Sequence, residues 1–196
     1  MVRVWVRQIG ALLVLSAPAA ASAQARQPYS IQASALYTTQ ELGDAGSVGG
    51  AGVEVQARFN PGRFSYGLGV QFSHHQSGDQ SLDLSGVFFE PRFAISIGSD
   101  RVTPYMAGRI VLMRQNSDFV VVPKFSTNGF GLGLGGGVLA HLTSRVNFDL
   151  GAAYLRQSFS DKQFDDGGEV DFSPFNGYVA KAGFTFGFGT RSSGGA

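Results

Sequence analysis

The chain has 196 residues, with 28 glycines, 17 phenylalanines, a formal net charge of +1 and only 15% charged residues. This length fits one domain of ordinary size, and the composition excludes a disordered chain or a highly charged nucleic-acid-binding protein. Because the sequence has no cysteine, neither a disulfide nor a thiolate metal site contributes to the fold.

Residues 1–23 have the pattern of a secretion signal peptide. Arg3 and Arg7 precede a short apolar run at 9–16, and Ala21-Ser22-Ala23 forms a small-x-small cleavage site. The apolar run is too short to cross a membrane as a helix. Cleavage would leave 13 basic residues (15 minus the two arginines) against 14 acidic ones, a formal charge of −1. This near-neutral balance argues against nucleic acid as a partner.

Eight stretches after this segment alternate apolar and polar residues, as β-strands with one apolar face do. In chain order they are 29–39, 50–60, 64–76, 82–97, 102–115, 127–142, 146–159 and 177–188. Pro91 lies inside the fourth stretch, where a proline removes a hydrogen-bond donor from the sheet, and the alternation does not explain it. Residues 191–196 are predicted to be a short flexible tail.

The connections between these stretches are predicted to differ in length. Those at 60–63, 98–101 and 142–145 have the composition of tight turns, and those at 40–49, 77–80, 116–126 and 160–172 are polar and generally longer. With an even number of strands, both termini and all tight turns lie on one side of the sheet. The longer connections then lie together on the other side.

The apolar faces are rich in phenylalanine. A water-soluble sandwich would bury such faces, but the recurrence of aromatic side chains in almost every stretch favours contact with lipid. The predicted lipid-facing phenylalanines are Phe59, Phe64, Phe72, Phe89, Phe93, Phe130, Phe148, Phe184 and Phe186. We therefore predict an all-β domain at 24–190, an eight-stranded antiparallel up-and-down transmembrane β-barrel, because a closed barrel is the only way for strands to span a bilayer.

The opposite faces carry charged residues that would point into the barrel. They are Glu54, Arg58, Glu90, Arg92, Arg109, Asp149 and Lys181. Since eight strands enclose only enough space for side chains, these charges must pair with one another, which predicts a salt-bridged plug. The alternative is a narrow gated path for water or solutes, and a row of glycines between Gly129 and Gly137 favours it by widening the interior.

Other patterns give weaker signals. Gly131–Gly136 matches a dinucleotide-binding string, but no helix follows it, so no nucleotide is expected. His74 and His75 face opposite sides of their strand and would not chelate one metal ion together. Both are predicted to be solvated or in contact with lipid headgroups, and His141 is predicted to be structural. The acidic stretch 160–172 lacks a calcium-loop frame, so neither a metal nor another cofactor is predicted.

The signal peptide, the eight alternating stretches, the asymmetric connections and the closing aromatic strand together resemble the small eight-stranded outer-membrane barrel family. Its relatives include the OmpA membrane domain, OmpW-like proteins and opacity-type surface proteins, and the resemblance covers about 29–188. It implies a location in the bacterial outer membrane, with outer-membrane lipid, lipopolysaccharide and the barrel assembly machinery as partners. Phe188 would be the final aromatic residue that this machinery reads, although eight residues follow it here.

This resemblance leaves three functions open. The first is a non-enzymatic surface protein whose barrel anchors external loops, for envelope integrity or adhesion, with an unknown external ligand. The second is a narrow OmpW-like pore for small solutes. The third is a lipid A-modifying enzyme, because His75 and Ser77 superficially resemble the His-x-Ser of outer-membrane lipid A deacylases.

Overall fold

In the computed structural model of the chain, the described residues are 27–41, 46–78, 80–99, 101–118, 125–160, 162–163, 169–170 and 174–189. The predicted signal peptide and the predicted tail lie outside these residues. No helix in the described part of the chain is long and apolar enough to cross a membrane.

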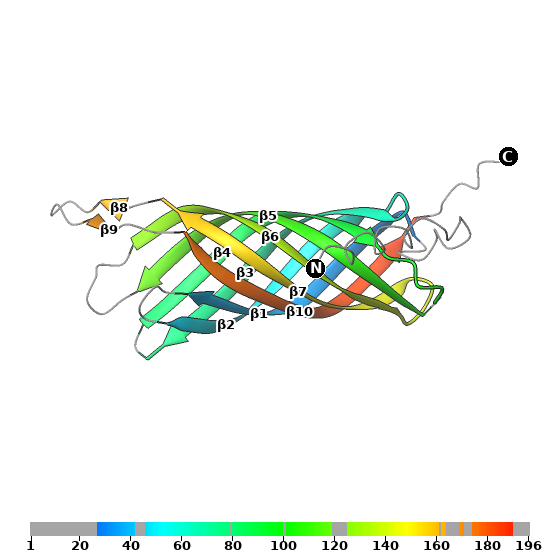
Figure 1. The fold of residues 1–196 in the computed structure, drawn as a ribbon, viewed down its shortest axis with the longest axis horizontal. Coiled ribbons are helices and arrows are strands. Elements are labelled where there is room, and N and C mark those ends of the chain that lie inside the picture. The colour runs from blue at the N-terminus through cyan, green and yellow to red at the C-terminus, as the bar shows by residue number, and fades with distance from the viewer. Residues whose placement is uncertain are drawn as a thin grey trace, which may run out of the picture.

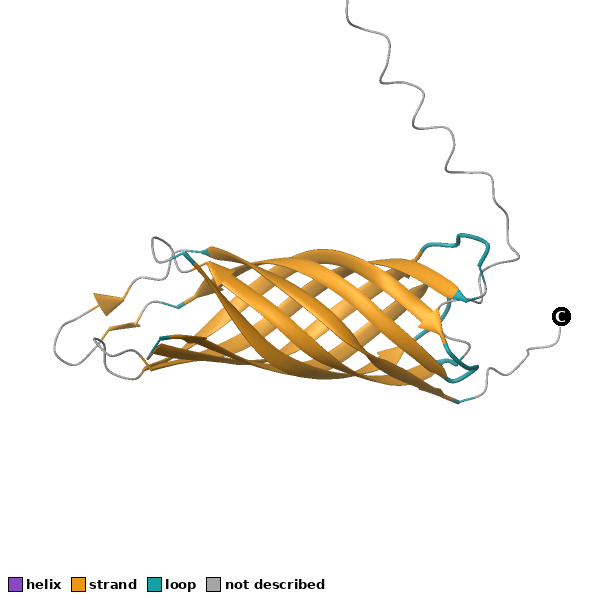
Figure 2. Ribbon diagram, turned by 90° about the horizontal axis from the view of Figure 1, so that it is seen from below, coloured by secondary structure: helices purple, strands orange, loops and turns teal. Residues whose placement is uncertain are grey.

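Eight long strands form one closed barrel (Figure 1). They are β1 (Tyr29–Glu41), β2 (Ser47–Phe59), β3 (Phe64–Ser77), β4 (Gln80–Ala94), β5 (Val102–Asp118), β6 (Phe125–His141), β7 (Val146–Phe159) and β10 (Phe175–Phe188). Each strand pairs antiparallel with its neighbours in sequence order, and the strands wind obliquely around the barrel (Figure 2). The short strands β8 (Lys162–Gln163) and β9 (Glu169–Val170) form a separate ladder at one end of the barrel.

The barrel closes where the first strand meets the last. β1 and β10 pair continuously, from Tyr29 opposite Phe188 to Gln40 opposite Gly177. This closure leaves no unpaired sheet edge among the eight long strands, which is the condition for placing a sheet in a bilayer. The predicted fold class, an eight-stranded antiparallel barrel, is confirmed.

Side-chain exposure follows the two-residue period of the strands. On β1, Ile31 is 48% exposed on the outer wall whereas Gln32 is fully buried in the interior. The contrast is sharpest on β6, where Leu134 on the outer wall is 76% exposed and Leu139 faces the interior at 3%. An apolar outer wall around a partly polar interior is the reverse of a water-soluble protein, and it fits a barrel surrounded by lipid.

Several strands extend two or three residues beyond their predicted bounds, for example β2 from Ser47 and β5 to Asp118, and two further differences change the connections. β3 and β4 continue until Ser77 pairs with Gln80, so these two residues, predicted to belong to the connection at 77–80, lie in the strands. At the opposite end, β4 stops at Ala94 instead of continuing to Ile97, which lengthens the connection before β5. The predicted difference in length between the connections at the two ends of the barrel is therefore smaller. Polar residues such as Ser77 and Gln80 belong to strands, whereas the apolar residues Ile95 and Ile97 do not.

Pro91 is accommodated without a bulge. On one side it pairs with Tyr66 of β3 in an unbroken register. On the other side the ladder with β5 is interrupted between Phe89 and Arg92 and then resumes in the same register. Gly108 of β5 lies beside the proline ring, and a side chain added there would come within 3.6 Å of it. That distance is an ordinary van der Waals contact, so the missing donor of Pro91 costs one local interruption of the ladder without requiring a glycine neighbour.

Candidate functional site

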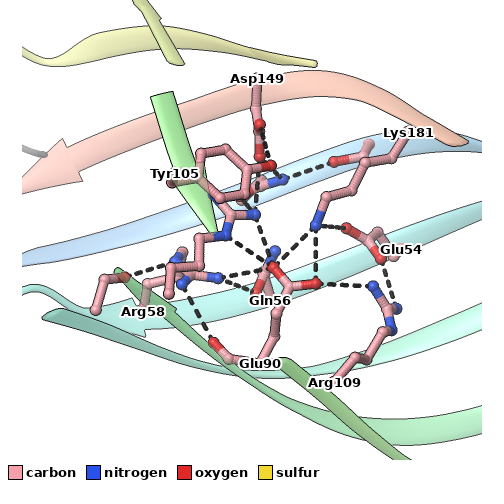
Figure 3. Close-up of polar contacts among 12 residues, drawn as sticks. Glu54, Gln56, Arg58, Glu90, Tyr105, Arg109, Asp149 and Lys181 are labelled. Atoms are coloured by element: carbon pink, nitrogen blue, oxygen red, sulfur yellow. Dashed lines mark hydrogen bonds and ion pairs between the residues drawn. The ribbon is translucent and has the colours of Figure 1, made fainter. Parts of the chain in front are cut away.

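The predicted interior charges lie in one buried cluster inside the barrel (Figure 3). β2, β4, β5, β7 and β10 contribute them, and none of the seven residues is more than 7% exposed. The cluster consists of Glu54, Arg58, Glu90, Arg92, Arg109, Asp149 and Lys181 and is called the interior charge cluster below. Its four cations and three carboxylates give 4 − 3 = +1, so the cluster is nearly neutral.

Glu90 is the centre of the cluster, because all four cations contact its carboxylate. Lys181 Nζ lies 2.9 Å from both oxygens, and Arg109 donates to Oε2 at 2.9 Å. Arg92 donates to Oε1 at 2.8 Å, and Arg58 lies 3.3 Å from the same atom. A carboxylate buried this deeply is tolerated because several cations and hydrogen-bond donors replace the water that it has lost.

The other two carboxylates extend the cluster in opposite directions. Asp149 Oδ2 lies 2.8 Å from the Arg92 guanidinium and accepts a hydrogen bond from Gln32 at 2.7 Å. Tyr105 donates its hydroxyl to Asp149 Oδ1 at 2.7 Å. Glu54 Oε2 accepts from Arg109 at 2.7 Å. Charged and neutral polar groups therefore form one connected network across the barrel interior.

Two aromatic side chains support the arginines and were not identified from the sequence. The Arg109 guanidinium lies 3.8 Å from the ring centre of Phe88, and that of Arg92 lies 4.3 Å from the ring centre of Tyr105. Stacking of this kind favours a cation that has lost its water shell. Phe88 and Tyr105 share their strand phase with Glu90 and Arg109, so the alternation held the signal that would have placed them inside.

A second interior layer is apolar and was also missed. Nine buried side chains fill the barrel between the charge cluster and the end that carries β8 and β9. They are Leu36, Leu82, Leu84, Phe88, Val111, Met113, Leu155, Phe159 and Val179, and are called the apolar interior layer below. The sequence interpretation assigned apolar side chains to the lipid, but these belong to the inward phase of their strands.

The glycine row of β6 does not widen the interior, because large side chains from neighbouring strands lie over it. A side-chain carbon added at four of its glycines would approach a neighbour far inside contact distance. The neighbours are Phe159 at Gly129, Val111 at Gly131, Leu155 at Gly133 and Tyr105 at Gly137, at 2.5, 2.7, 2.6 and 2.5 Å. The glycines therefore make room for packing rather than for a channel.

The histidines lie in three different settings. His75 is fully buried in the interior, where its Nε2 is 2.8 Å from Thr38 Oγ1, so the prediction of a solvated or headgroup-contacting side chain is wrong for it. It has this space because Gly50 lies beneath its ring. His74 is exposed on the outer wall and lies 2.6 Å from Asp83. His141 contacts Thr103 and Asn147 at the opposite rim, at 2.9 and 2.7 Å.

The predicted lipid-facing phenylalanines all point to the outer wall. Phe148 is half-buried because its ring packs edge-on against Phe184, 5.5 Å away, and the other eight are 38–53% exposed. At the end where the termini of the barrel meet, Tyr29 lies between Phe59 and Phe188, with ring centres 5.5 and 6.1 Å away.

Aromatic residues mark both borders of the apolar wall. On β1 the borders are Tyr29 and Tyr37, which are 49% and 58% exposed. The eight residue steps from one to the other span about 27 Å along a strand, or roughly 20 Å of height at a strand tilt of about 40°. Outer-membrane barrels have an apolar band of about 25 Å between two aromatic girdles, and the wall measured on β1 comes within about 5 Å of that height.

A closed antiparallel barrel with an apolar wall, two aromatic girdles and a charged interior defines the class of transmembrane β-barrel proteins. The chain belongs to the outer membrane protein beta-barrel domain family, whose model matches residues 9–191. The protein is therefore located in the bacterial outer membrane, in contact with its lipid and lipopolysaccharide. No curated protein matches the sequence.

Several solved structures share the fold at low sequence identity. Neisserial surface protein A (NspA) is 18% identical with a TM-score of 0.67, over 82% of this chain and 97% of that chain. The outer membrane protein H (OprH) of Pseudomonas aeruginosa is 16% identical with a TM-score of 0.52, over 81% and 99%. The N-terminal barrel domain of Pseudomonas aeruginosa OprF is 12% identical with a TM-score of 0.50, over 82% and 98%.

Among the described residues, no group of three or more histidine, aspartate or glutamate side chains could hold a metal ion. The interior charge cluster itself contains more cations than carboxylates, and each carboxylate already accepts hydrogen bonds from cationic or neutral donors. This arrangement can hold the strands of the barrel together from the inside, because ion pairs and hydrogen bonds link five of them.

Proposed function

We propose that the protein is a non-enzymatic surface protein of the outer membrane whose filled barrel anchors its external connections, for envelope integrity or adhesion. Residues 1–23 would be a signal peptide that is removed on secretion, and 191–196 a tail. Phe188, which is exposed on the outer wall at the end of β10, would be read by the barrel assembly machinery. No external ligand is assigned.

The observation that carries this proposal is the filled interior. Glu90 contacts four cations, and the apolar interior layer fills the space beside them. A barrel of eight strands is narrow enough for side chains to fill it completely. A rigid, blocked barrel is suited to holding the connections between its strands and not to passing solutes.

The orientation follows from the position of the termini. Short periplasmic turns and longer external loops are usual in outer-membrane barrels, with the chain ends on the periplasmic side. The start of β1 pairs with the end of β10, so β1, β3, β5 and β7 end, and β2, β4, β6 and β10 begin, at the other end of the barrel. We take that end, which carries β8 and β9, as external.

A narrow pore is the second candidate, and its main support is lost. The glycine row that suggested a wider interior is covered by Phe159, Val111, Leu155 and Tyr105. A conducting path would have to cross both the interior charge cluster and the apolar interior layer. The enzyme alternative loses support as well, because the buried His75 imidazole contacts Thr38 and does not face lipid.

Planar bilayer recording tests whether the barrel is blocked. The refolded protein is expected to give no stepwise current at any applied voltage, because the paired charges and the apolar side chains occupy the barrel interior. A general porin inserted in the same bilayers serves as the positive control. Regular unitary openings of the wild-type barrel would contradict the anchor proposal and favour a pore.

Epitope labelling of intact cells tests the orientation. A tag inserted after Gly78, between β3 and β4, is expected to bind antibody on intact cells. The matched control carries the same tag after Gly62, in the turn between β2 and β3 at the opposite end, and is expected to be labelled only after permeabilisation. The reverse pattern would show that the connections we call external face the periplasm.

A further inference from the structure

A shallow groove of about 640 Å³ runs across the outer wall over β3, β4, β5 and β6. Six of its ten lining residues form two adjacent outward-facing rows, and the other four, Gln71, Gly86, Met113 and Gly129, lie between these rows in the inward phase. Val70, Val87 and Leu112 lie opposite one another in the first row, and Ser85, Arg114 and Asn128 do so in the second. The groove lies on the outer wall because these six side chains all belong to the outward phase of their strands.

The two rows differ in chemistry and in height. The apolar row lies toward the middle of the membrane, since Val70, Val87 and Leu112 are 50–58% exposed in the apolar band. The polar row lies two residues, or about 7 Å along a strand, closer to the end that we take as external. The groove is therefore apolar at its inner end and polar and cationic at its outer end.

Arg114 gives the outer end its charge. Its Nε donates to Ser126 Oγ at 2.8 Å, which holds the guanidinium on the outer wall. No carboxylate in the described part of the chain forms an ion pair with it, unlike every arginine of the interior charge cluster. A guanidinium in this position is suited to a phosphate, to which it can donate two parallel hydrogen bonds.

We propose that this groove binds the lipid A part of lipopolysaccharide, with an acyl chain along Val70, Val87 and Leu112 and a sugar phosphate at Arg114. The hydroxyl of Ser85 and the amide of Asn128 flank the guanidinium and are suited to the sugar. Lipid A is chosen because the polar end faces the outer leaflet, so the inference depends on the orientation proposed above.

Native mass spectrometry of the full mature protein, released from detergent micelles, tests this site. Bis-phosphorylated lipid A is expected to remain bound, and lipid A without both phosphates to bind about tenfold more weakly, which corresponds to the loss of one charge-assisted contact. Arg114→Gln is expected to lower the affinity for bis-phosphorylated lipid A by a similar factor. The variant removes no apolar packing, and its band shift on unheated gels shows whether it is folded.

Arg156→Gln is the matched control, since Arg156 is an exposed arginine on the outer wall of β7 outside the groove. It is expected to bind lipid A as the wild type does. Equal losses in both variants, an unchanged affinity of Arg114→Gln, or equally tight binding of phosphatidylglycerol would overturn the assignment. Such a failure would leave the anchor proposal standing, because bilayer recording and surface labelling test that separately.

Discussion

Replacing Glu90 with glutamine is expected to lower the free energy of unfolding of the barrel by about 3–5 kcal/mol, the usual cost of breaking a buried ion pair from one side. Glu90 is 2% exposed and contacts four cations. The substitution keeps the shape of the side chain but changes the charge of the cluster from 4 − 3 = +1 to 4 − 2 = +2. Four buried cations would then surround a neutral amide.

The measurement is a urea titration of the refolded barrel in lipid vesicles, followed by the shift between folded and unfolded bands on unheated gels. The matched control is the double variant Glu90→Gln with Lys181→Gln, whose cluster returns to 3 − 2 = +1. We expect the double variant to be more stable than Glu90→Gln alone. If Glu90→Gln unfolds at the wild-type urea concentration, the interior charge cluster does not hold the barrel together.

The outer wall and the closure of this fold could be predicted from the sequence for a physical reason. A strand alternates its side chains between two faces, so the spacing of Phe184, Phe186 and Phe188 predicts that all three lie on the same face of the sheet. An even number of such strands with no helix between them leaves one closed arrangement that satisfies every backbone group in lipid. The pairing of Tyr29 with Phe188 completes that arrangement.

The interior was less predictable, because inward residues in a narrow barrel need not be polar. Phe88 lies on the same face of β4 as Glu90 and is buried with it. Its aromatic side chain would nevertheless be assigned to the lipid face by composition alone, and only the two-residue alternation places it inside. The sequence also did not show which interior charges form ion pairs with one another. Glu90 and Lys181 are 91 residues apart, and only the tilt and stagger of the closed sheet bring them together.

The rims show a third limit. Polar residues such as Ser77 and Gln80 look like a loop in the sequence, yet they continue the ladder of β3 and β4 above the apolar band. A strand that leaves the membrane needs no apolar face, so its end cannot be located by alternation. His75 illustrates the consequence, since a histidine near a strand end was expected outside and lies inside.

Leu134→Arg is expected to destabilise the barrel by about 2–4 kcal/mol, the cost of a basic side chain on the lipid face at the bilayer midplane. Leu134 is 76% exposed, the largest value among the outward apolar side chains. On β6 it lies between Phe130 and Ala140, and Ala140 pairs with Phe148 of β7. Leu134 is therefore near the middle of the apolar band. In a water-soluble protein the same change at so exposed a position would cost almost nothing.

This contrast makes the position a direct test of what surrounds the barrel. The matched control is Ser158→Arg, on the exposed outer face of β7 near its external end, where the cost should fall to about 0–1 kcal/mol. Urea titrations of both variants in lipid vesicles give the comparison. Equal stability of the two variants would mean that the wall at Leu134 does not face hydrocarbon, and the membrane assignment of the outer wall would have to be abandoned. A loss confined to Leu134→Arg would instead fix the depth of β6 in the bilayer, and with it the height at which Arg114 meets the outer leaflet.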